Sequence, residues 1–302
     1  MMNISVVIPN FNGRDLLEKH LPSVILALEK NDEIIVVDDA STDDSMSYLS
    51  KNYPRVKIVK NNENKRYADT CNNGIEQAKN EFILLLNNDV SPNANVKAYL
   101  LPHFKDIDIF AVGCLEHAPS GQISGKSTGR FSRGMFMHNR AQNFQPGRTM
   151  WATGGSMMVR KSYWQLIGGM DNLYRPAYYE DIDISYRAWK HGWFVLFEPK
   201  AFVVHGHEST NSTVFGKEVM DVMSYKNSFL FLWKNVTDPQ IFLSHLLWLP
   251  YHLIVGGWRS RGRIILGFCQ ALLQMHEVVE KRKKVSPLWS LSDGAVIKKV
   301  RT

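Results

Sequence analysis

The chain has little cysteine, and Cys71, Cys114 and Cys269 lie far apart with no Cys-x-x-Cys spacing. This argues against a disulfide framework and against a cysteine-based zinc site. The N-terminus also lacks a basic segment and a small-residue cleavage site, so we expect its apolar run to be a strand rather than a signal peptide. These absences favour a reducing compartment, and we expect a cytoplasmic protein.

Internal repeats and low-complexity tracts are absent from the 302 residues, of which 44% are apolar, as in a globular protein. The net charge of +7 is concentrated at one end. From Tyr225 onward there are twelve Lys or Arg against four Asp or Glu, which leaves −1 for residues 1–224. Such asymmetry predicts an anionic partner for the C-terminal part, either lipid or nucleic acid. No nucleic-acid recognition motif accompanies the basic residues, so we expect no nucleic-acid partner.

Four short runs rich in Ile and Val alternate with helical patterns over the first ninety residues. The runs are continuous, as expected of strands that are buried on both faces. This βαβαβαβ order predicts an α/β fold with a parallel sheet. We expect strands at Ile4–Ile8, Ile34–Val37, Val56–Val59 and Phe82–Leu86, and helices at residues 16–28, Ser45–Leu49 and Ala68–Ala78.

Polar and acidic residues follow three of these strands, and ligands of such sheets bind beyond the carboxyl ends of the strands. The ends read Pro9-Asn10, Asp38-Asp39 and Asn87-Asn88-Asp89. No Gly-x-Gly-x-x-Gly follows the first strand and no Walker lysine loop is present, which argues against a dinucleotide oxidoreductase and a phosphate-loop NTPase. A carboxylate-bound divalent cation is the obvious alternative for holding phosphates. Taken alone, the third end can also be a polar turn.

The second half contains a glycine-paired strand, Trp151–Val159, and a helix that opens with Glu180, Asp181 and Asp183. Three acids in four residues exceed what one helix cap requires. Between the two halves, residues 116–148 show little periodicity, and we expect an irregular, mobile excursion that contributes specificity.

The C-terminal third contains the apolar run Ile241–Gly257, followed by Arg259, Arg261 and Arg263. The run falls short of the ~20 residues that span a membrane. We expect an interfacial amphipathic segment on anionic head groups, and a helix packed on the core is the alternative.

Five motifs follow one another along the chain: SVVIPNFNG, IIVVDDASTDDS, NNGIEQAKNEFILLLNNDV, ATGGSMMVRKSYWQLIGGMD and YYEDIDISYRAWKHG. In this order they resemble the family 2 glycosyltransferases and, among them, the bacterial rhamnosyltransferase-like subgroup. The resemblance implies the GT-A fold, a Rossmann-like, mostly parallel sheet flanked by helices. It covers roughly residues 4–210, and we expect a catalytic domain at 1–224, with a nucleotide half at about 1–115 and an acceptor half at about 116–224. A helical extension would occupy 225–302.

The resemblance implies inverting transfer from a UDP- or dTDP-type sugar to a glycan or lipid-linked acceptor, with Mg²⁺ or Mn²⁺. Asp39 would read the base or ribose, and Asp38 would order its loop. Asp89 would be the main metal ligand, because Asn87 replaces the first acid of the Asp-x-Asp motif. His205 would complete the metal site, with His207 as its competitor. The implied donor-binding residues are Pro9, Asn10, Asp39, Arg66, Asn87 and Asn88.

The resemblance also assigns the acceptor side. Asp181 would be the general base that deprotonates the acceptor hydroxyl, and Glu180 would orient the acceptor or the backbone. The implied acceptor-binding residues are Trp151, Gly154, Gly155 and Asp183, and Asp183 would, like Glu180, orient either the acceptor or the backbone.

Two departures leave alternatives open. Arg66 replaces the glycine of an Asn-x-Gly-Phe-Ala pattern, and it can pair with a diphosphate or remain solvated. Asn87 is either a weak metal ligand or a sugar contact. A catalytically silent carbohydrate- or nucleotide-binding protein on this fold, or a nucleotide-sugar hydrolase, is therefore the competing hypothesis. The sequence does not define the oligomeric state.

Overall fold

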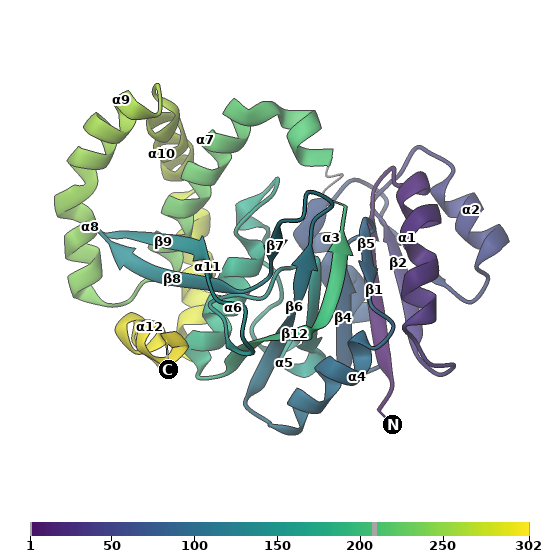
Figure 1. The fold of residues 1–302 in the computed structure, drawn as a ribbon. Helices are drawn as coiled ribbons and strands as arrows, with labels where there is room; N and C mark the ends of the chain where they lie inside the picture. Colours follow the sequence, from purple (N-terminus) through teal and green to yellow (C-terminus); the bar gives the residue numbers. More distant parts are fainter. Residues whose placement is uncertain (1, 207–209, 302) are drawn as a thin grey trace.

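The computed structural model describes residues 2–206 and 210–301. Within them, ten strands form one mixed sheet in the middle of the molecule, with helices around it (Figure 1). Eight strands follow the order β10-β12-β6-β11-β4-β1-β2-β3, while β5 pairs with β12 and β7 pairs with β6. β11 runs antiparallel to β4 and β6, so β1 to β4, β6 and β12 all point the same way. The expected α/β fold with a mostly parallel sheet is confirmed.

The four strands expected in the first ninety residues are present and pair in parallel. All five residues of β4 are buried, because helices cover both faces of the sheet. Asn10 lies opposite Asp38 in the register of β1 and β2, so the polar strand ends share one edge. The strands of the main sheet are β1 Ile4–Asn10, β2 Glu33–Asp38, β3 Lys57–Lys60, β4 Phe82–Leu86, β5 Val90–Pro92, β6 Ile109–His117, β7 Ile123–Ser124, β10 Gly147–Arg148, β11 Ser156–Arg160 and β12 Phe194–His205.

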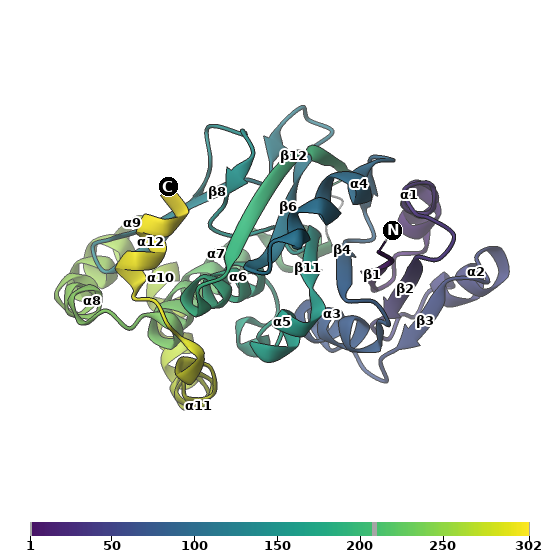
Figure 2. The same cartoon turned by 90° about the horizontal axis from the view of Figure 1, so that it is seen from below.

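Two groups of helices cover the two faces of the sheet (Figure 2). The apolar residues of α1, α2 and α4 form one core cluster with the sheet. Those of α3, α5 and α6 form a second cluster on the opposite face, which continues into the C-terminal helices. The helices are α1 Arg14–Leu26, α2 Ser45–Asn52, α3 Arg66–Gln77, α4 Val96–Leu100, η1 Leu101–Lys105, α5 Lys161–Leu166, η2 Asn172–Tyr174 and α6 Glu180–His191.

Residues 116–148 are more regular than the sequence suggests, and the prediction of an irregular excursion was wrong. Two strands, β8 (Ser127–Ser132) and β9 (Met135–Arg140), form an antiparallel hairpin outside the main sheet. Phe136 of this hairpin packs on Phe231 of α7 with ring centroids 4.8 Å apart. The hairpin thus gains its core from helices far along the chain, which local periodicity does not reveal.

The C-terminal residues form a helical layer beside the sheet (Figure 1). α7 crosses the boundary expected after residue 224, so that division falls inside a helix and remains a proposal. The backbone of α7 is kinked at Gly216. The elements are α7 Thr210–Asn235, α8 Pro239–Tyr251, the π-helical turn η3 His252–Gly256, α9 Gly257–Arg259, α10 Arg263–Leu273, α11 Met275–Val285, η4 Ser286–Leu288 and α12 Asp293–Arg301.

The elements α8, η3 and α9 form one continuous apolar helix of 21 residues, Pro239–Arg259. Its length and composition are sufficient to cross a membrane, so the expectation of a run too short to span was wrong. The helix continues beyond both ends of the apolar run. Only 11% of its most apolar window is buried, which also contradicts the alternative of a helix packed into the core.

A buried ionic cluster fastens α7 to α6. Lys234 Nζ of α7 lies 2.9 Å from both carboxylate oxygens of Asp183, and Arg187 Nε lies 2.7 Å from Asp183 Oδ2. Asp171 also contacts Lys234 Nζ, at 2.5 Å. Because removing one partner of a buried ion pair leaves an uncompensated charge, this cluster holds α6 in place relative to α7.

Candidate active site

The polar residues that follow β1, β2 and β4 meet at one edge of the sheet. Asn88 Nδ2 donates to Asn10 Oδ1 at 2.8 Å, and the N–H of Asp39 donates to the carbonyl of Asn10 at 2.8 Å. Gly13 is required beside them, since a Cβ there would lie 2.2 Å from Asn88 Nδ2. Pro9 precedes Asn10 in β1 and is half-buried. The structure therefore brings these donor-binding candidates together.

The Asp39 carboxylate organises the loop that leads into α3. Its Oδ1 accepts from Asn61 Nδ2 at 2.7 Å and from the N–H of Lys65 at 2.8 Å, while Oδ2 accepts from the N–H of Arg66 at 2.9 Å. Asp38 contributes its carbonyl to this loop, which accepts from the N–H of Asn61 at 2.8 Å. The Asp39 carboxylate makes more of the bonds that order the loop, and the Oδ1 atom of Asp38 has no hydrogen-bond partner among the described residues. A nucleotide contact of Asp39 stays a prediction.

Arg66 adopts the left-handed backbone conformation, with φ of +70°. That conformation is unfavourable for residues with a Cβ and favours glycine, which explains why the related pattern has glycine here. Bonds from its N–H to Asp39 and to Asn64 Oδ1 hold the backbone in place. Its side chain is exposed, so the structure leaves both roles considered for Arg66 open.

Asn87 and Asp89 lie in the turn between β4 and β5. The N–H of Asn87 donates to the carbonyl of Gly155 at 3.0 Å. Its Oδ1 is buried and has no hydrogen-bond partner among the residues that the structure describes. An amide oxygen left unpaired in this way needs a ligand, because burial without a partner is costly.

Asp89 and Glu116 lie on either side of His205, at the end of β12. His205 Nε2 is 3.3 Å from Asp89 Oδ1, and His205 Nδ1 is 3.5 Å from Glu116 Oε1. Burial alone would lower the pKa of His205, but the two carboxylates outweigh burial and raise that pKa to about 9. Burial would likewise raise the pKa of Asp89, and His205 reverses the effect and lowers it. An imidazolium therefore balances two carboxylates here.

Sequence reasoning missed Glu116. It is buried, and it also accepts from Ser156 Oγ at 2.6 Å and Ser124 Oγ at 3.0 Å. The available signal was an acid near the end of the apolar run of β6, which is the same pattern that identified the acids after β2 and β4.

The donor set near Asp89 fits a hard divalent cation. A carboxylate and an unpaired amide oxygen are the ligand types that Mg²⁺ and Mn²⁺ prefer, and the cation takes its remaining oxygens from phosphates or water. Across residues 2–206 and 210–301, no group of three or more His, Cys, Asp or Glu side chains is arranged to hold a metal ion. The competing candidate His207 lies outside the described residues.

Glu180 and Asp181 form the first turn of α6, directly after two residues in the left-handed conformation. Tyr178 and Tyr179 have φ of +72° and +80°. Such conformations are costly for bulky residues and concentrate at functional sites. Burial raises the pKa of Asp181 to about 6, although backbone N–H bonds oppose the increase. Burial, followed by the charge of Asp181, raises the pKa of Glu180 to about 8.

Gly154 and Gly155 connect these acids to the turn after β4. The N–H of Gly154 donates to Asp181 Oδ2 at 3.3 Å, while the carbonyl of Gly155 accepts from the N–H of Asn87. A Cβ on Gly155 would lie 2.5 Å from Asn87 Nδ2, so the close approach requires glycine. Gly154 and Gly155 therefore link the turn that contains Asn87 and Asp89, the candidate metal ligands, to Asp181, the candidate base.

Two further acceptor candidates have different surroundings. Asp183 is fully buried and accepts from Tyr174 OH at 2.7 Å as well as from the cations of α6 and α7. These partners enclose the Asp183 carboxylate, so the prediction that it binds the acceptor was wrong, and the alternative that it supports the backbone of the helix agrees with the structure. Trp151 is half-buried, and its ring meets the His138 ring edge-on at 5.5 Å.

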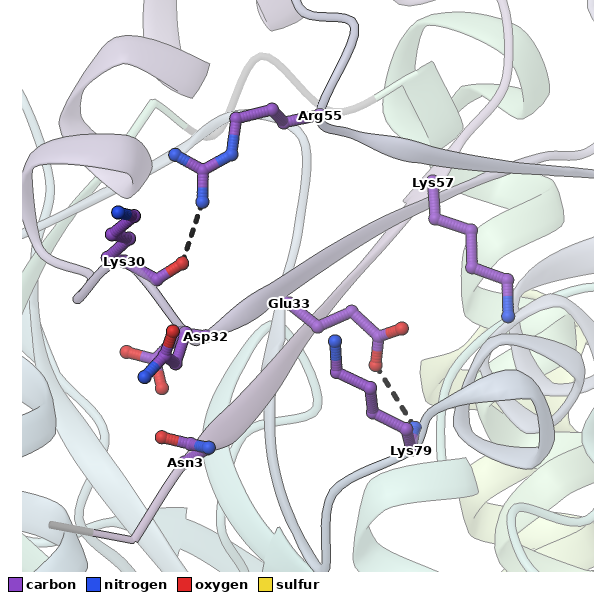
Figure 3. Close-up of a pocket in the computed structure, with 8 residues that line it drawn as sticks. Asn3, Lys30, Asp32, Glu33, Arg55, Lys57 and Lys79 are labelled. Atoms are coloured by element: carbon purple, nitrogen blue, oxygen red, sulfur yellow. Dashed lines mark hydrogen bonds between the residues drawn. The ribbon is translucent and has the colours of Figure 1, made fainter.

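A basic hollow of about 510 Å³ lies at the opposite ends of β1 and β2 (Figure 3). Its polar groups are largely engaged with one another. Arg55 Nη2 donates to the carbonyl of Lys30 at 2.7 Å, and the N–H of Lys79 donates to Glu33 Oε2 at 3.0 Å. The hollow is remote from the carboxyl ends of the strands and takes no part in the candidate site.

The family model described as Glycosyl transferase family 2 matches residues 5–167. An N-acetylglucosaminyl-diphospho-decaprenol L-rhamnosyltransferase of Mycobacterium tuberculosis is 25% identical over 233 residues, covering 67% of this chain and 75% of that protein.

Two solved structures share the fold at low sequence identity. The mannosyltransferase PcManGT of Pyrobaculum calidifontis, in complex with GDP-Man and Mn²⁺, superposes with a TM-score of 0.57 at 14% identity, over 95% of this chain and 80% of that one. GalNAc-T7 with UDP, GalNAc and Mn²⁺ superposes with a TM-score of 0.58 at 20% identity, over 75% of this chain and 50% of that one. The fold is therefore GT-A, as expected.

Proposed function

The chain belongs to glycosyl transferase family 2, and on that premise we propose that it transfers a sugar from a UDP- or dTDP-type donor to a lipid-linked or glycan acceptor. The family and its rhamnosyltransferase-like relative confirm the resemblance found in the sequence. That relative is named for a diphospho-decaprenol acceptor, which supports a lipid-linked acceptor here. We assign the reaction to the synthesis of a cell-surface polysaccharide.

One observation carries the proposal. Asn87 and Asp181 hydrogen-bond to the adjacent residues Gly155 and Gly154, so the diphosphate side and the acceptor side of the site share one rigid backbone segment. A transferase needs this proximity, because the nucleophile and the leaving group must be held in line across one anomeric carbon.

Asp89 and Asn87 would hold Mg²⁺ or Mn²⁺, with His205 as the third ligand once the cation has displaced the proton of its imidazolium. When bound, the cation would stabilise the negative charge that develops on the departing diphosphate. The two solved neighbours, one with UDP, GalNAc and Mn²⁺ and the other in complex with GDP-Man and Mn²⁺, support this assignment.

Asp181 would take the proton of the acceptor hydroxyl. At the same time the acceptor oxygen would form a bond to the anomeric carbon, and the bond between that carbon and the diphosphate would break. Attack from the side opposite the leaving group inverts the anomeric configuration. A pKa of about 6 suits this role, since the carboxylate is ionised at neutral pH and more basic than an ordinary aspartate. Glu180, with a pKa of about 8, would be protonated and would donate a hydrogen bond.

We also propose that the enzyme works at the inner face of the cell membrane. The largely exposed helix Pro239–Arg259 and the basic residues that follow it support attachment to anionic lipid.

A donor screen tests the proposed function. The full chain is incubated with Mn²⁺ and a panel of nucleotide sugars, and binding and nucleotide release are measured with and without candidate acceptors. We expect metal-stimulated binding of one donor and release that depends on an acceptor. Nucleotide release at the same rate with and without acceptors would identify a hydrolase. Donor binding without nucleotide release would identify a catalytically silent binding protein. Failure to bind any nucleotide sugar would refute the family-based function.

A further inference from the structure

A cavity of about 670 Å³ lies between the β8–β9 hairpin, α7 and the helix Pro239–Arg259. Tyr179, the residue before Glu180 and Asp181, forms part of its wall. The His138 ring, also in the wall, meets Tyr179 edge-on at 5.3 Å and Trp151 edge-on at 5.5 Å. The cavity therefore lies beside the residue that precedes the candidate acids, and none of the strand-end residues proposed to bind the donor lines it.

The cavity wall is apolar and cationic at once. Phe136, Val255 and Ile264 contribute apolar surface, while Arg133, Arg259 and Arg263 contribute charge. Among the lining residues that the structure describes, there is no Asp or Glu.

Two of these arginines are available for an anionic ligand. Arg263 is engaged with Glu218 at 3.2 Å and Asp221 at 3.3 Å. Arg133 and Arg259 are exposed, and neither has a carboxylate within ion-pair distance in the part of the chain that the structure describes. Guanidinium groups bind phosphate oxygens strongly because the donors match them in pairs.

Hydrogen bonds join the β8–β9 hairpin to the helix Pro239–Arg259, so the two walls of the cavity are held at a fixed separation. His252 Nε2 lies 2.9 Å from the carbonyl of Arg133, and His245 Nδ1 lies 3.1 Å from the carbonyl of Gly134. A Cβ on Gly134 would lie 2.2 Å from the His245 backbone. The Arg133 guanidinium also stacks 5.0 Å from the centre of the Trp248 ring.

Large apolar side chains on the same helices are exposed. Trp258 is 83% exposed, Ile254 72% and Leu247 71%, and Leu273 of α10 is 86% exposed. Large apolar side chains that are exposed near one another mark contact sites for other proteins or for membranes. The helix that walls the cavity thus also carries a surface suited to lipid.

We propose that this cavity holds the phosphate-bearing end of a lipid-linked acceptor. Arg133 and Arg259 bind the phosphates, the acyl or prenyl chain leaves toward the exposed apolar helices, and the acceptor sugar extends past Tyr179 to Asp181. The inference rests on the proposed function and specifies the acceptor class of that site.

Binding to three probes tests the assignment. Full-length protein is titrated with tetraprenyl diphosphate in neutral detergent micelles, with tetraprenol in the same micelles, and with inorganic pyrophosphate. We expect the lipid diphosphate to bind at least about tenfold more tightly than either of the other two, because only it satisfies both the arginines and the apolar wall. Equal binding of pyrophosphate or of tetraprenol would overturn the assignment.

Variants localise the binding. The double variant Arg133→Gln/Arg259→Gln and the cavity-filling Val255→Trp should each weaken tetraprenyl diphosphate binding at least about tenfold. Arg261→Gln is the matched control, since Arg261 is exposed, neighbours Arg259 and does not line the cavity. Unchanged binding in both cavity variants would overturn the proposal. Two variants are used because Arg133 also supports Tyr251, and thermal melts identify any loss of folding.

Mn²⁺-dependent donor binding is measured in the same preparations. Donor binding without tetraprenyl diphosphate binding would overturn the cavity assignment alone and leave the proposed function intact. Absence of donor binding would refute the proposed function and this inference with it.

Discussion

The backbone N–H of Gly154 donates to Asp181 Oδ2 at 3.3 Å. This bond fixes the orientation of the Asp181 carboxylate, the candidate base. Its donor is a backbone N–H, which no side-chain substitution can remove. Its neighbour Gly155 is bonded in turn to Asn87, so a displacement of either side is transmitted to the other. The following predictions test this arrangement and the helices that support it.

Asp181→Asn should abolish glycosyl transfer and leave donor binding within about twofold of wild type, because the donor-binding residues lie on the strand ends. General-base catalysis contributes about 10²–10⁴ in rate, which sets the expected loss of kcat. The measurement is nucleotide release together with donor titration. Parallel loss of both would reassign Asp181 to the donor site.

The rate of transfer should rise with pH through about 6. Burial raises the pKa of Asp181 to that value, and the base must be deprotonated to accept the hydroxyl proton. The profile of kcat/KM from pH 4.5 to 8 measures this dependence. A profile that is flat between pH 5 and 7 would contradict the assignment of the base.

Glu180→Gln should stabilise the protein at pH 8. Burial raises the pKa of Glu180 to about 8, above its unfolded value, so the native state gains stability from the proton at low pH and loses it as pH rises from about 4.5 to 8. An amide avoids the buried charge, and we expect a gain of about 1–3 kcal/mol at pH 8. Denaturant unfolding at pH 5 provides the comparison, where the gain should largely vanish.

Arg66→Gly and Arg66→Ala separate the backbone and side-chain roles of Arg66. Glycine relieves the left-handed strain and should raise the free energy of unfolding by about 1 kcal/mol, whereas alanine keeps the strain. If Arg66 is solvated, both variants bind the donor normally. If it pairs with the diphosphate, both weaken donor binding about tenfold or more.

Lys234→Met should lower the free energy of unfolding by about 3–5 kcal/mol, because it leaves Asp183 and Asp171 without their shared buried cation. Lys298→Met, at an exposed position of α12, is the control and should change stability little. Equal effects of the two substitutions would show that the cluster contributes no net stability.

Leu247→Glu and Trp258→Glu should each reduce flotation with anionic liposomes, since both side chains are largely exposed on the apolar helix. Leu26→Glu is the matched control, because Leu26 is 79% exposed on α1, far along the chain from that helix. Binding should also weaken with salt, as expected for basic residues on anionic head groups. Flotation that is unaffected by the first two substitutions would place the membrane contact elsewhere.

Much of the fold of residues 1–115 could be predicted from sequence because its signals are local. Strands such as Phe82–Leu86 are continuous apolar runs, and parallel pairing brings their polar ends to one edge. Glu116 and the β8–β9 hairpin were missed because their partners, His205 and Phe231, lie about 90 residues further along the chain. Asp183 was assigned to the acceptor because one of the two cations that neutralise it, Lys234, lies on a distant helix.

The passage of α7 across residue 224 has a practical consequence for anyone shortening this protein. A chain cut there would lose the half of α7 that carries Lys234, while Asp183 stayed buried two residues from the base with one of its two cations gone. The C-terminal helices thus support α6, the helix that carries the candidate base, and cannot be removed as a detachable anchor. A more soluble, active variant should instead be sought by substituting the exposed apolar side chains of α8 to α10 in the full-length chain.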